Sequence, residues 1–319
     1  MSRPPQPQPL PQPPGKAREL TAVSADGSRI HIEVYGSEGR PAVVLAHGWT
    51  CAIRFWAAQI AELATAHRVI VYDQRGHGRT AAPGRDGYTT DALADDLEAV
   101  LAATLEPGEK AVLAGHSMGA MAIMAAARRP ALREHAAAAL LCSTGSSRLV
   151  PESLVLPLRA GRVRTWLTRL VLGARAPLGP VTSLSKRILR YGTMGPGSAP
   201  ERVTECARIV HACPRGTRVA WSQVLGTLDL DADVRELRVP TAVLVGTADR
   251  LTPPVQARTL AAALPDCAGL TELAGMGHMT PVEAPEAVTA GIRRLVATHL
   301  EARPGTTSGT TTGTKEDVA

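Results

Sequence analysis

One serine in this sequence has surroundings that could make it a nucleophile. Ser117 lies in the middle of Gly-His-Ser-Met-Gly (115–119), after the apolar run Ala111 to Ala114 and before the Ala- and Met-rich segment Ala120 to Ala127. This pattern predicts a strand, a sharp turn and a helix. Such a turn projects a hydroxyl out of the fold and points backbone N–H groups at the oxygen of an attacked carbonyl group. We therefore predict that Ser117 is the nucleophile of an acyl-transfer reaction.

A nucleophilic serine needs a base to take its proton and an acid to orient that base. Asp249 follows the β-branched apolar run Val239 to Val245, at the strand end where open α/β sheets place their ligands. His278 comes later, in a glycine-flanked loop after a second expected strand, Gly269 to Leu273. Alone, Asp249 could be a turn carboxylate and His278 an ordinary loop residue. Their order after Ser117, each at a strand end, predicts a Ser-His-Asp triad.

Acyl transfer also needs two preorganised donors for the oxyanion. The short apolar run Ala42 to Ala46 ends in a His-Gly-Trp-Thr turn (47–50), and a glycine there lets the backbone turn its N–H groups toward a site. We predict that the backbone N–H groups of Trp49 and Met118 form this oxyanion hole. Three neighbours are expected at the substrate pocket: His47, Gly48 and His116. Of these, His47 fits fixing the loop better than acting as an acid or base.

These segments together resemble the α/β-hydrolase superfamily, in its serine-nucleophile, esterase- or lipase-like branch with a lid. The segments are His47 to Trp49, the turn Asp73 to Gly78, the serine motif, Asp249 after its strand, and Gly277-His278. The resemblance covers roughly residues 18 to 300. It implies an α/β fold with a mostly parallel eight-stranded sheet, flanking helices and a helical lid inserted before the strand that carries the acid.

The resemblance also narrows the chemistry. Dehalogenases and epoxide hydrolases of this fold use Asp as nucleophile, whereas position 117 is Ser. We expect a serine hydrolase that cleaves a carboxylic ester through an acyl-enzyme, without a metal or an organic cofactor. A C–C bond hydrolase, a thioesterase or a cofactor-free perhydrolase would use the same triad and remain alternatives. A pure ligand-binding receptor is a further alternative, although the triad here is complete in sequence.

Composition predicts the domain organisation. The chain has 319 residues, 45% of them hydrophobic, which suits one large α/β domain with a lid. We expect the core to comprise residues 17–144 and 236–302, and the lid to comprise residues 145–235. The Pro-rich segment 1–16 and the Thr/Gly-rich segment 303–319 are expected to be disordered tails.

The sequence shows neither a secretion signal nor a membrane-spanning pattern. The start lacks a basic-then-apolar signal peptide and no run approaches 18 apolar residues, which makes cytoplasm the default expectation. Five cysteines form an odd number without Cys-x-x-Cys spacing, an arrangement that argues against a disulfide framework and a zinc site.

Positive charge is concentrated in the expected lid. Residues 145–228 contain 13 Lys plus Arg against 3 Asp plus Glu, a net charge of +10, while the whole chain carries +6. Within it, Leu154 to Leu172 has the pattern of a basic amphipathic helix after Pro157. Such a helix could be a solvent-exposed cover of the active site, could guide an anionic acyl substrate, or could dock on anionic lipid without spanning a membrane.

Nucleic acid is disfavoured as a partner, because the basic segment lacks interleaved aromatics. The oligomeric state is left open.

Overall fold

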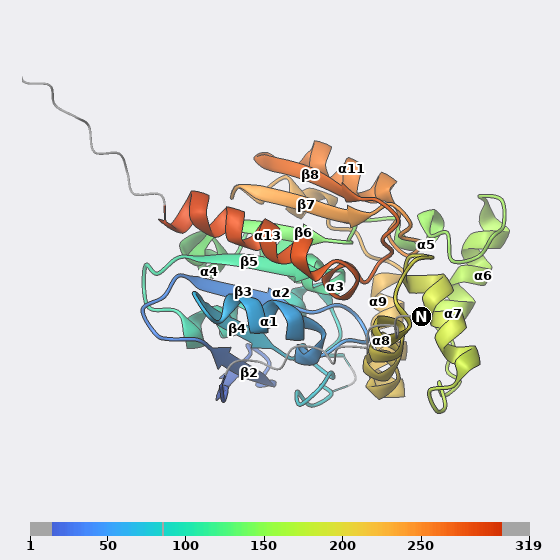
Figure 1. Cartoon of the computed structure of the whole chain (residues 1–319), viewed down its shortest axis with the longest axis horizontal. Coiled ribbons are helices and arrows are strands. Elements are labelled where there is room, and N and C mark those ends of the chain that lie inside the picture. Colours follow the sequence, from blue (N-terminus) through green and yellow to red (C-terminus); the bar gives the residue numbers. More distant parts are fainter. Residues whose placement is uncertain (1–14, 85, 302–319) are drawn as a thin grey trace, which may run out of the picture.

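The computed structural model describes residues 15–84 and 86–301 (Figure 1). Within these residues, eight strands form one sheet in the order β1-β2-β4-β3-β5-β6-β7-β8. The strands are β1 (Arg18–Val23), β2 (Arg29–Tyr35), β3 (Ala42–Ala46), β4 (Arg68–Tyr72), β5 (Ala111–His116), β6 (Ala136–Cys142), β7 (Thr241–Gly246) and β8 (Cys267–Leu273). β2 pairs antiparallel with β1 and β4, and the other pairs are parallel. The predicted eight-stranded, mostly parallel α/β sheet is confirmed.

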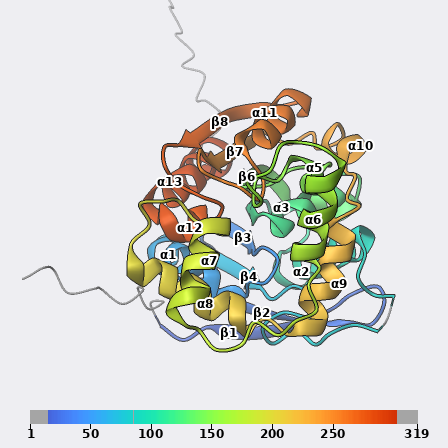
Figure 2. The ribbon, with the colours of Figure 1, turned by 90° about the vertical axis from the view of Figure 1, so that its right-hand side faces the viewer.

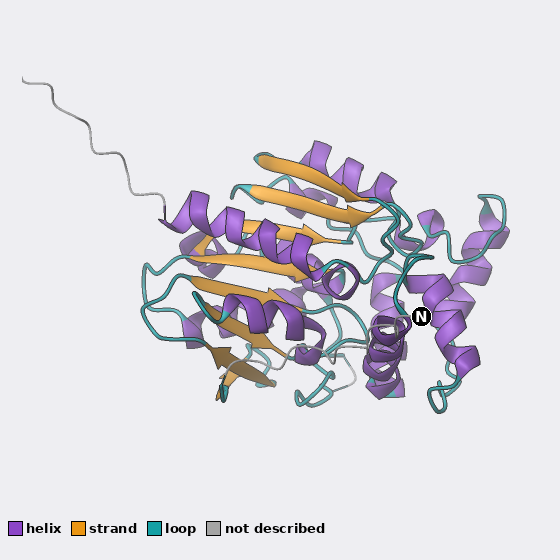
Figure 3. Cartoon of the chain, viewed as in Figure 1, coloured by secondary structure: helices purple, strands orange, loops and turns teal. Residues whose placement is uncertain are grey.

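Helices cover both faces of the sheet (Figure 3). One face is covered by η1 (Ile53–Trp56), α1 (Ala57–Leu63), α12 (Thr280–Glu283), α13 (Pro285–Val296) and the following π-helical turn η2 (Ala297–Glu301). The other is covered by α2 (Thr90–Thr104), α3 (Met118–Ala125), α4 (Pro130–His135), α10 (Asp231–Val234) and α11 (Pro254–Ala263). Because both faces are covered, the central strands are continuous apolar runs rather than alternating ones, and every residue of β3 and β4 is buried.

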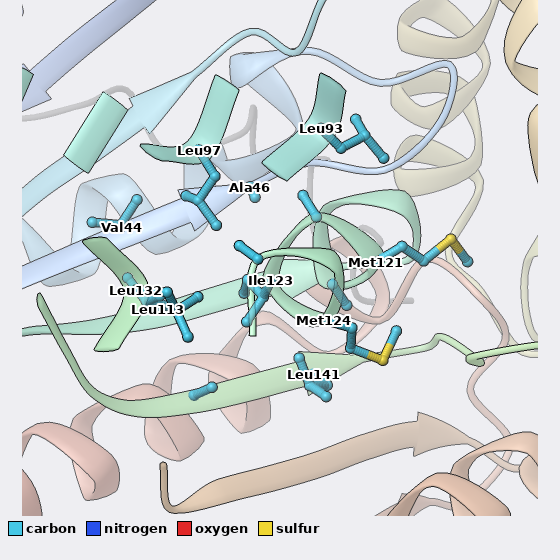
Figure 4. Packing of buried hydrophobic residues seen from close by; sticks show 14 of the residues in the cluster. Val44, Ala46, Leu93, Leu97, Leu113, Met121, Ile123, Met124, Leu132 and Leu141 are labelled. Carbon is cyan, nitrogen blue, oxygen red and sulfur yellow. The ribbon is translucent and has the colours of Figure 1, made fainter. Parts of the chain in front are cut away.

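The core on the α2 and α3 side is aliphatic. Figure 4 shows Met121, Ile123 and Met124 of α3 packed among leucines of α2, β5 and β6. This packing explains why the short α3 is buried almost all round, with seven of its eight residues inaccessible. The helix that follows Ser117 is therefore held by the core rather than by its own propensity.

The helical insertion lies between β6 and β7. It contains α5 (Leu149–Glu152), α6 (Arg162–Leu172), α7 (Ser183–Thr193), α8 (Pro200–Ala212) and α9 (Arg215–Leu225). In Figure 1 these helices lie at the right, beyond the carboxyl ends of the parallel strands, and in Figure 2 they face the viewer. We call α5–α9 the lid. The amphipathic segment expected over Leu154 to Leu172 is helical only from Arg162, because Gly161, with φ 154°, precedes the first turn.

Other expectations concern the ends and the cysteines. The expected disordered tails, residues 1–16 and 303–319, lie outside the described residues, apart from Gly15 and Lys16. All five cysteines are free thiols. Across the described ranges, every helix is too short or too polar to cross a lipid bilayer.

Candidate active site

Ser117 occupies a strained turn between β5 and α3. Its backbone has φ 51° and ψ −116°, a conformation that is costly for a residue with a Cβ. The turn is fastened on both sides, because the Ser117 N–H donates to the Cys142 carbonyl of β6 and the Ser117 carbonyl accepts from the N–H groups of Ala120 and Met121. A Cβ at Gly119 would lie 2.1 Å from the Ala46 carbonyl oxygen, so β3 and the turn can pack together only around a glycine.

Asp249 and His278 meet across the ends of β7 and β8. The His278 Nδ1–H donates to Asp249 Oδ2 at 2.9 Å, and both side chains are buried. With Nδ1 as the donor in this contact, Nε2 is the ring nitrogen left for a further partner. The other carboxylate oxygen, Oδ1, accepts the N–H groups of Leu251 and Thr252 at 2.9 Å each. Asp249 thus orients the imidazole and closes its own turn at the same time.

Thr252 is a site residue that sequence reasoning missed. Its hydroxyl donates to Asp249 Oδ2 at 2.9 Å and lies 3.1 Å from His278 Nδ1. The available signal was its position three residues after Asp249, the spacing at which a carboxylate accepts a backbone N–H as in a helix cap. That spacing indicates the turn but does not indicate a contact with a histidine 26 residues further on.

The backbone of the His278 loop is held from two directions. The His116 Nε2–H donates to the His278 carbonyl at 2.8 Å. From the lid, the carbonyl of Thr193, the last residue of α7, accepts the N–H groups of His278 and Met279. Burial, with His278 nearby, holds the pKa of His116 well below its usual range, so His116 is a neutral support for the loop.

Glu283 joins this loop to the lid, and sequence reasoning missed it as well. Its buried carboxylate accepts the N–H groups of Gly277 and Met279 at 3.1 Å. The same carboxylate accepts the Gly195 N–H and the Ser198 hydroxyl, at 2.6 Å each, from the connection between α7 and α8. A buried carboxylate is stable only when its oxygens are satisfied in this way.

The loop after β3 is fastened by two buried histidines. His47 Nδ1–H donates to the Gly48 carbonyl, and His47 Nε2 accepts the Gln74 N–H at 3.1 Å. His77 Nε2 accepts the Thr50 N–H at 3.2 Å, where Thr50 has a φ of 63°. Burial lowers the pKa of His47 to about 4 and that of His77 to about 3, so both rings are neutral and can accept an N–H.

Two backbone N–H groups remain uncommitted near Ser117. Thr50 and Cys51 donate to His77 and to the Gly48 carbonyl, whereas the Trp49 N–H has no acceptor among the described residues. Met118 is the first residue of α3, where N–H groups have no partner within the helix. These are the two residues predicted for the oxyanion hole, and the helix N-terminus at Met118 favours negative charge.

A cavity of about 600 Å³ connects the site to the lid. Its wall includes Trp49, His116, Ser117, Thr252 and His278 from the core. The lid contributes mainly apolar residues: Leu149, Val150, Val155, Leu156, Val171, Leu172, Leu178, Ile188, Leu189, Val210 and Leu225. Among the described residues, neither His47 nor Gly48 belongs to this wall, which differs from the expected pocket. The reason is that the His47 ring is held beneath the loop by its hydrogen bonds, and Gly48 packs against His116.

A sheet of this topology, with helices on both faces and a helical insertion over the carboxyl ends of its strands, defines the class of protein. Residues 43–291 match the alpha/beta hydrolase family, which is more than half of the chain. The chain belongs to the alpha/beta hydrolase family.

Three relatives illustrate how far this likeness reaches. The chain is 33% identical over 152 residues to "Probable oxidoreductase EphD" of Mycobacterium tuberculosis, covering 47% of this chain and 25% of that protein. It is 34% identical over 100 residues to "Epoxide hydrolase 4" of Homo sapiens, covering 31% of this chain and 27% of that protein. The chain thus matches about a quarter of the length of each. A thermophilic esterase from Thermogutta terrifontis has a similar structure, with a TM-score of 0.70, 26% identity, and coverage of 89% of this chain and 100% of that chain.

Proposed function

We propose that this hydrolase cleaves carboxylic esters through an acyl-enzyme formed on Ser117. The observation that carries the proposal is the 2.9 Å contact between His278 Nδ1 and Asp249 Oδ2, with His278 in the wall of the same cavity as Ser117. An oriented imidazole that lines the same cavity as a serine in a strained turn is the arrangement that activates a weak nucleophile. The likeness to an esterase over most of the chain supports the ester bond as the target.

The proposed reaction has two halves. Ser117 Oγ attacks the carbonyl carbon while His278 Nε2 takes its proton, and Asp249 stabilises the imidazolium that forms. The N–H groups of Trp49 and Met118 receive the oxyanion, a contribution worth about 10²- to 10³-fold per donor. His278 then gives its proton to the leaving alkoxide as the ester C–O bond breaks. In the second half a water, deprotonated by His278, attacks the acyl-enzyme and releases the acid.

The cavity favours an apolar acyl group. Its lid-derived wall is mainly Leu, Val and Ile, so a bound aliphatic chain leaves water without meeting buried charges. Each buried methylene is worth about 0.8 kcal/mol. We therefore expect kcat/KM to rise about fourfold for each added methylene until the chain fills the cavity.

A p-nitrophenyl ester series from acetate to palmitate tests both parts of the proposal. Wild type should hydrolyse the series with an optimum above acetate, and Ser117→Ala should fall by about 10⁶-fold, to the background rate. Circular dichroism of Ser117→Ala should match that of wild type. An equal rate for the two proteins would refute the role of Ser117. A kcat/KM that falls steadily from acetate to the longer esters would refute the apolar pocket.

Labelling with a fluorophosphonate separates the nucleophile from the substrate. Wild type should be labelled, Ser117→Ala should not, and Ser222→Ala, which removes another serine of the cavity wall, should keep the label. Labelling without hydrolysis of any ester would mean that the triad works on another bond, such as a thioester or a C–C bond. Labelling of Ser117→Ala would overturn the assignment.

A further inference from the structure

The two outermost lid helices expose apolar side chains to solvent. Val163, Trp166 and Leu170 lie on one face of α6, and Leu184, Ile188 and Tyr191 lie on one face of α7. Their spacings place each triplet on one side of its helix. Val163 is 69% exposed, Trp166 60% and Leu184 65%, and α7 contains no buried residue. We call these six residues the apolar face. Large apolar side chains gathered and exposed on one face of a protein mark an interaction site.

Unpaired cations accompany the apolar face. Residues 153–200 contain no Asp or Glu, but they contain eight basic residues: Arg159, Arg162, Arg164, Arg169, Arg175, Lys186, Arg187 and Arg190. Arg164 is the buried member of the set, and its guanidinium donates to the Pro151 carbonyl. Within the described ranges, none of the exposed arginines of this stretch has a carboxylate within ion-pair distance. The positive charge is therefore available to a partner.

We propose that α6 and α7 dock onto an anionic lipid surface, with the apolar face inserted among the acyl chains and the arginines against the headgroups. An amphipathic helix with Trp and Leu on one side and Arg beside them binds membrane interfaces in this way. A second copy of this chain is the disfavoured occupant. A symmetric contact would bring the same patch of each copy together, and the arginines of both copies would face one another.

The mouth of the cavity lies on the same side of the molecule. Val171, Leu178, Ile188 and Tyr191 line the cavity and are also exposed, so the cavity opens between α6 and α7. In Figure 1 these helices lie farthest from the sheet, and in Figure 2 they face the viewer. A docked molecule therefore has its opening against the lipid. Entry of a lipid-borne acyl group through this opening rests on the proposed function, whereas docking does not.

Trp166 provides the first measurement, because Trp56 and Trp221 are buried and Trp49 is half-buried. Full-length protein is mixed with vesicles of phosphatidylcholine alone or with equal parts of phosphatidylglycerol. The anionic vesicles should shift the tryptophan emission to the blue and the neutral ones should not. Trp166→Phe keeps the apolar face and should lose the shift but still co-sediment with anionic vesicles. An equal response to neutral vesicles would overturn the proposal.

Matched variants test the surface itself. The double variant Arg162→Glu/Arg187→Glu should lower the affinity for anionic vesicles by at least about 25-fold, since each arginine near such a surface contributes about fivefold. The pair Arg235→Glu/Arg294→Glu changes net charge equally, at exposed positions outside the lid helices, and should have little effect. Val163→Ser/Leu184→Ser should also weaken binding, and Val23→Ser/Val255→Ser, at other exposed sites, should not.

The controls keep the proposal separate from catalysis. Val163 and Leu184 lie outside the cavity wall, so hydrolysis of a water-soluble ester by their variant should equal that of wild type. Binding is measured without turnover, so vesicle binding by an inactive protein would leave the docking proposal standing while the function fails. Absence of binding, binding that the lid variants do not change, or dimerisation abolished by Val163→Ser/Leu184→Ser would each overturn it.

Discussion

His278 is a residue whose ring and backbone are fixed by different partners. Asp249 and Thr252 contact the ring, while His116, Thr193 and Glu283 hold the loop through backbone groups on or beside it. The proposed base is thus already in position and would lose little freedom when the reaction begins, which is the advantage of preorganisation. The partners of the ring should affect the chemical step more than the fold.

Thr252→Val tests that expectation at the residue scale. The valine keeps the shape but removes the hydroxyl that donates to Asp249 Oδ2. One hydrogen bond to a charged group contributes about 1.5 kcal/mol, so kcat should fall about tenfold, with KM nearly unchanged. Steady-state kinetics on the best ester of the series is the measurement. Thr252→Ser should restore most of the rate, and an unchanged kcat in Thr252→Val would show that the hydroxyl has no part in orienting the base.

At the scale of elements, the lid and the core share the site. Glu283 at the end of α12 binds the His278 loop with one set of contacts and the connection between α7 and α8 with another. The Trp49 indole N–H donates to the Arg218 carbonyl of α9, so the loop after β3 is tied to the lid too. The lid therefore positions the site in addition to covering it.

Glu283→Gln should weaken this link. A glutamine amide nitrogen cannot accept, so at least one of the donors around position 283 loses its acceptor inside the protein. A buried unsatisfied donor costs about 1 to 3 kcal/mol, and we expect the free energy of unfolding to drop by at least about 1 kcal/mol. Urea denaturation provides the value. Glu286→Gln, at an exposed position on α13, is the control, and equal stability of both variants with wild type would contradict the role of Glu283.

At the scale of the whole molecule, buried neutral histidines make stability depend on pH. Burial lowers the pKa of His47 to about 4, that of His77 to about 3 and that of His116 well below the ordinary value. Between about pH 6.5, where a free histidine titrates, and these lowered values, the unfolded chain binds more protons than the folded one. Stability is therefore fully present above about pH 6.5 and decreases as the pH falls below it.

We expect the loss to approach about 1.4 kcal/mol per pH unit for each such histidine. Urea unfolding between about pH 7.5 and 5 measures how steeply the free energy of unfolding depends on pH. His77→Gln should reduce this slope by the contribution of one histidine, about 1.4 kcal/mol per pH unit. Burial raises the pKa of Asp73, whose Oδ1 lies 3.8 Å from His47 Nε2. At lower pH the folded chain takes up a proton at Asp73 before the unfolded chain does, which stabilises the fold and opposes the effect of the histidines. The measurement therefore ends at about pH 5. A stability that is flat with pH, or a slope unchanged in His77→Gln, would contradict this account.

The local patterns of the sequence determined much of this molecule. Apolar runs predicted the strands that became β3, β5 and β7 to within a few residues, because a strand that is buried on both faces must be apolar along its whole length. The edge strand β8 was also expected, although it is exposed along most of its length. The resemblance carried by these motifs implied a helical insertion before the strand that leads to Asp249, and α5–α9 lie there. The order of Ser117, Asp249 and His278 at strand ends predicted a triad at one edge of the sheet, because parallel strands bring their carboxyl ends together. In the structure His278 contacts Asp249 and lines the same cavity as Ser117.

Tertiary structure alone decided what surrounds those residues. Thr252 and Glu283 contact the His278 loop through turns that hydrophobic periodicity in the sequence does not predict. Thr193 of the lid contacts the same loop although it lies 85 residues away in the sequence. Packing also turned His47 away from the cavity and left Trp166 outside, although a sequence pattern fits either position. Side-chain types and spacing specify elements through local physics, whereas contacts between distant elements depend on how their surfaces pack, and only the folded chain defines those surfaces.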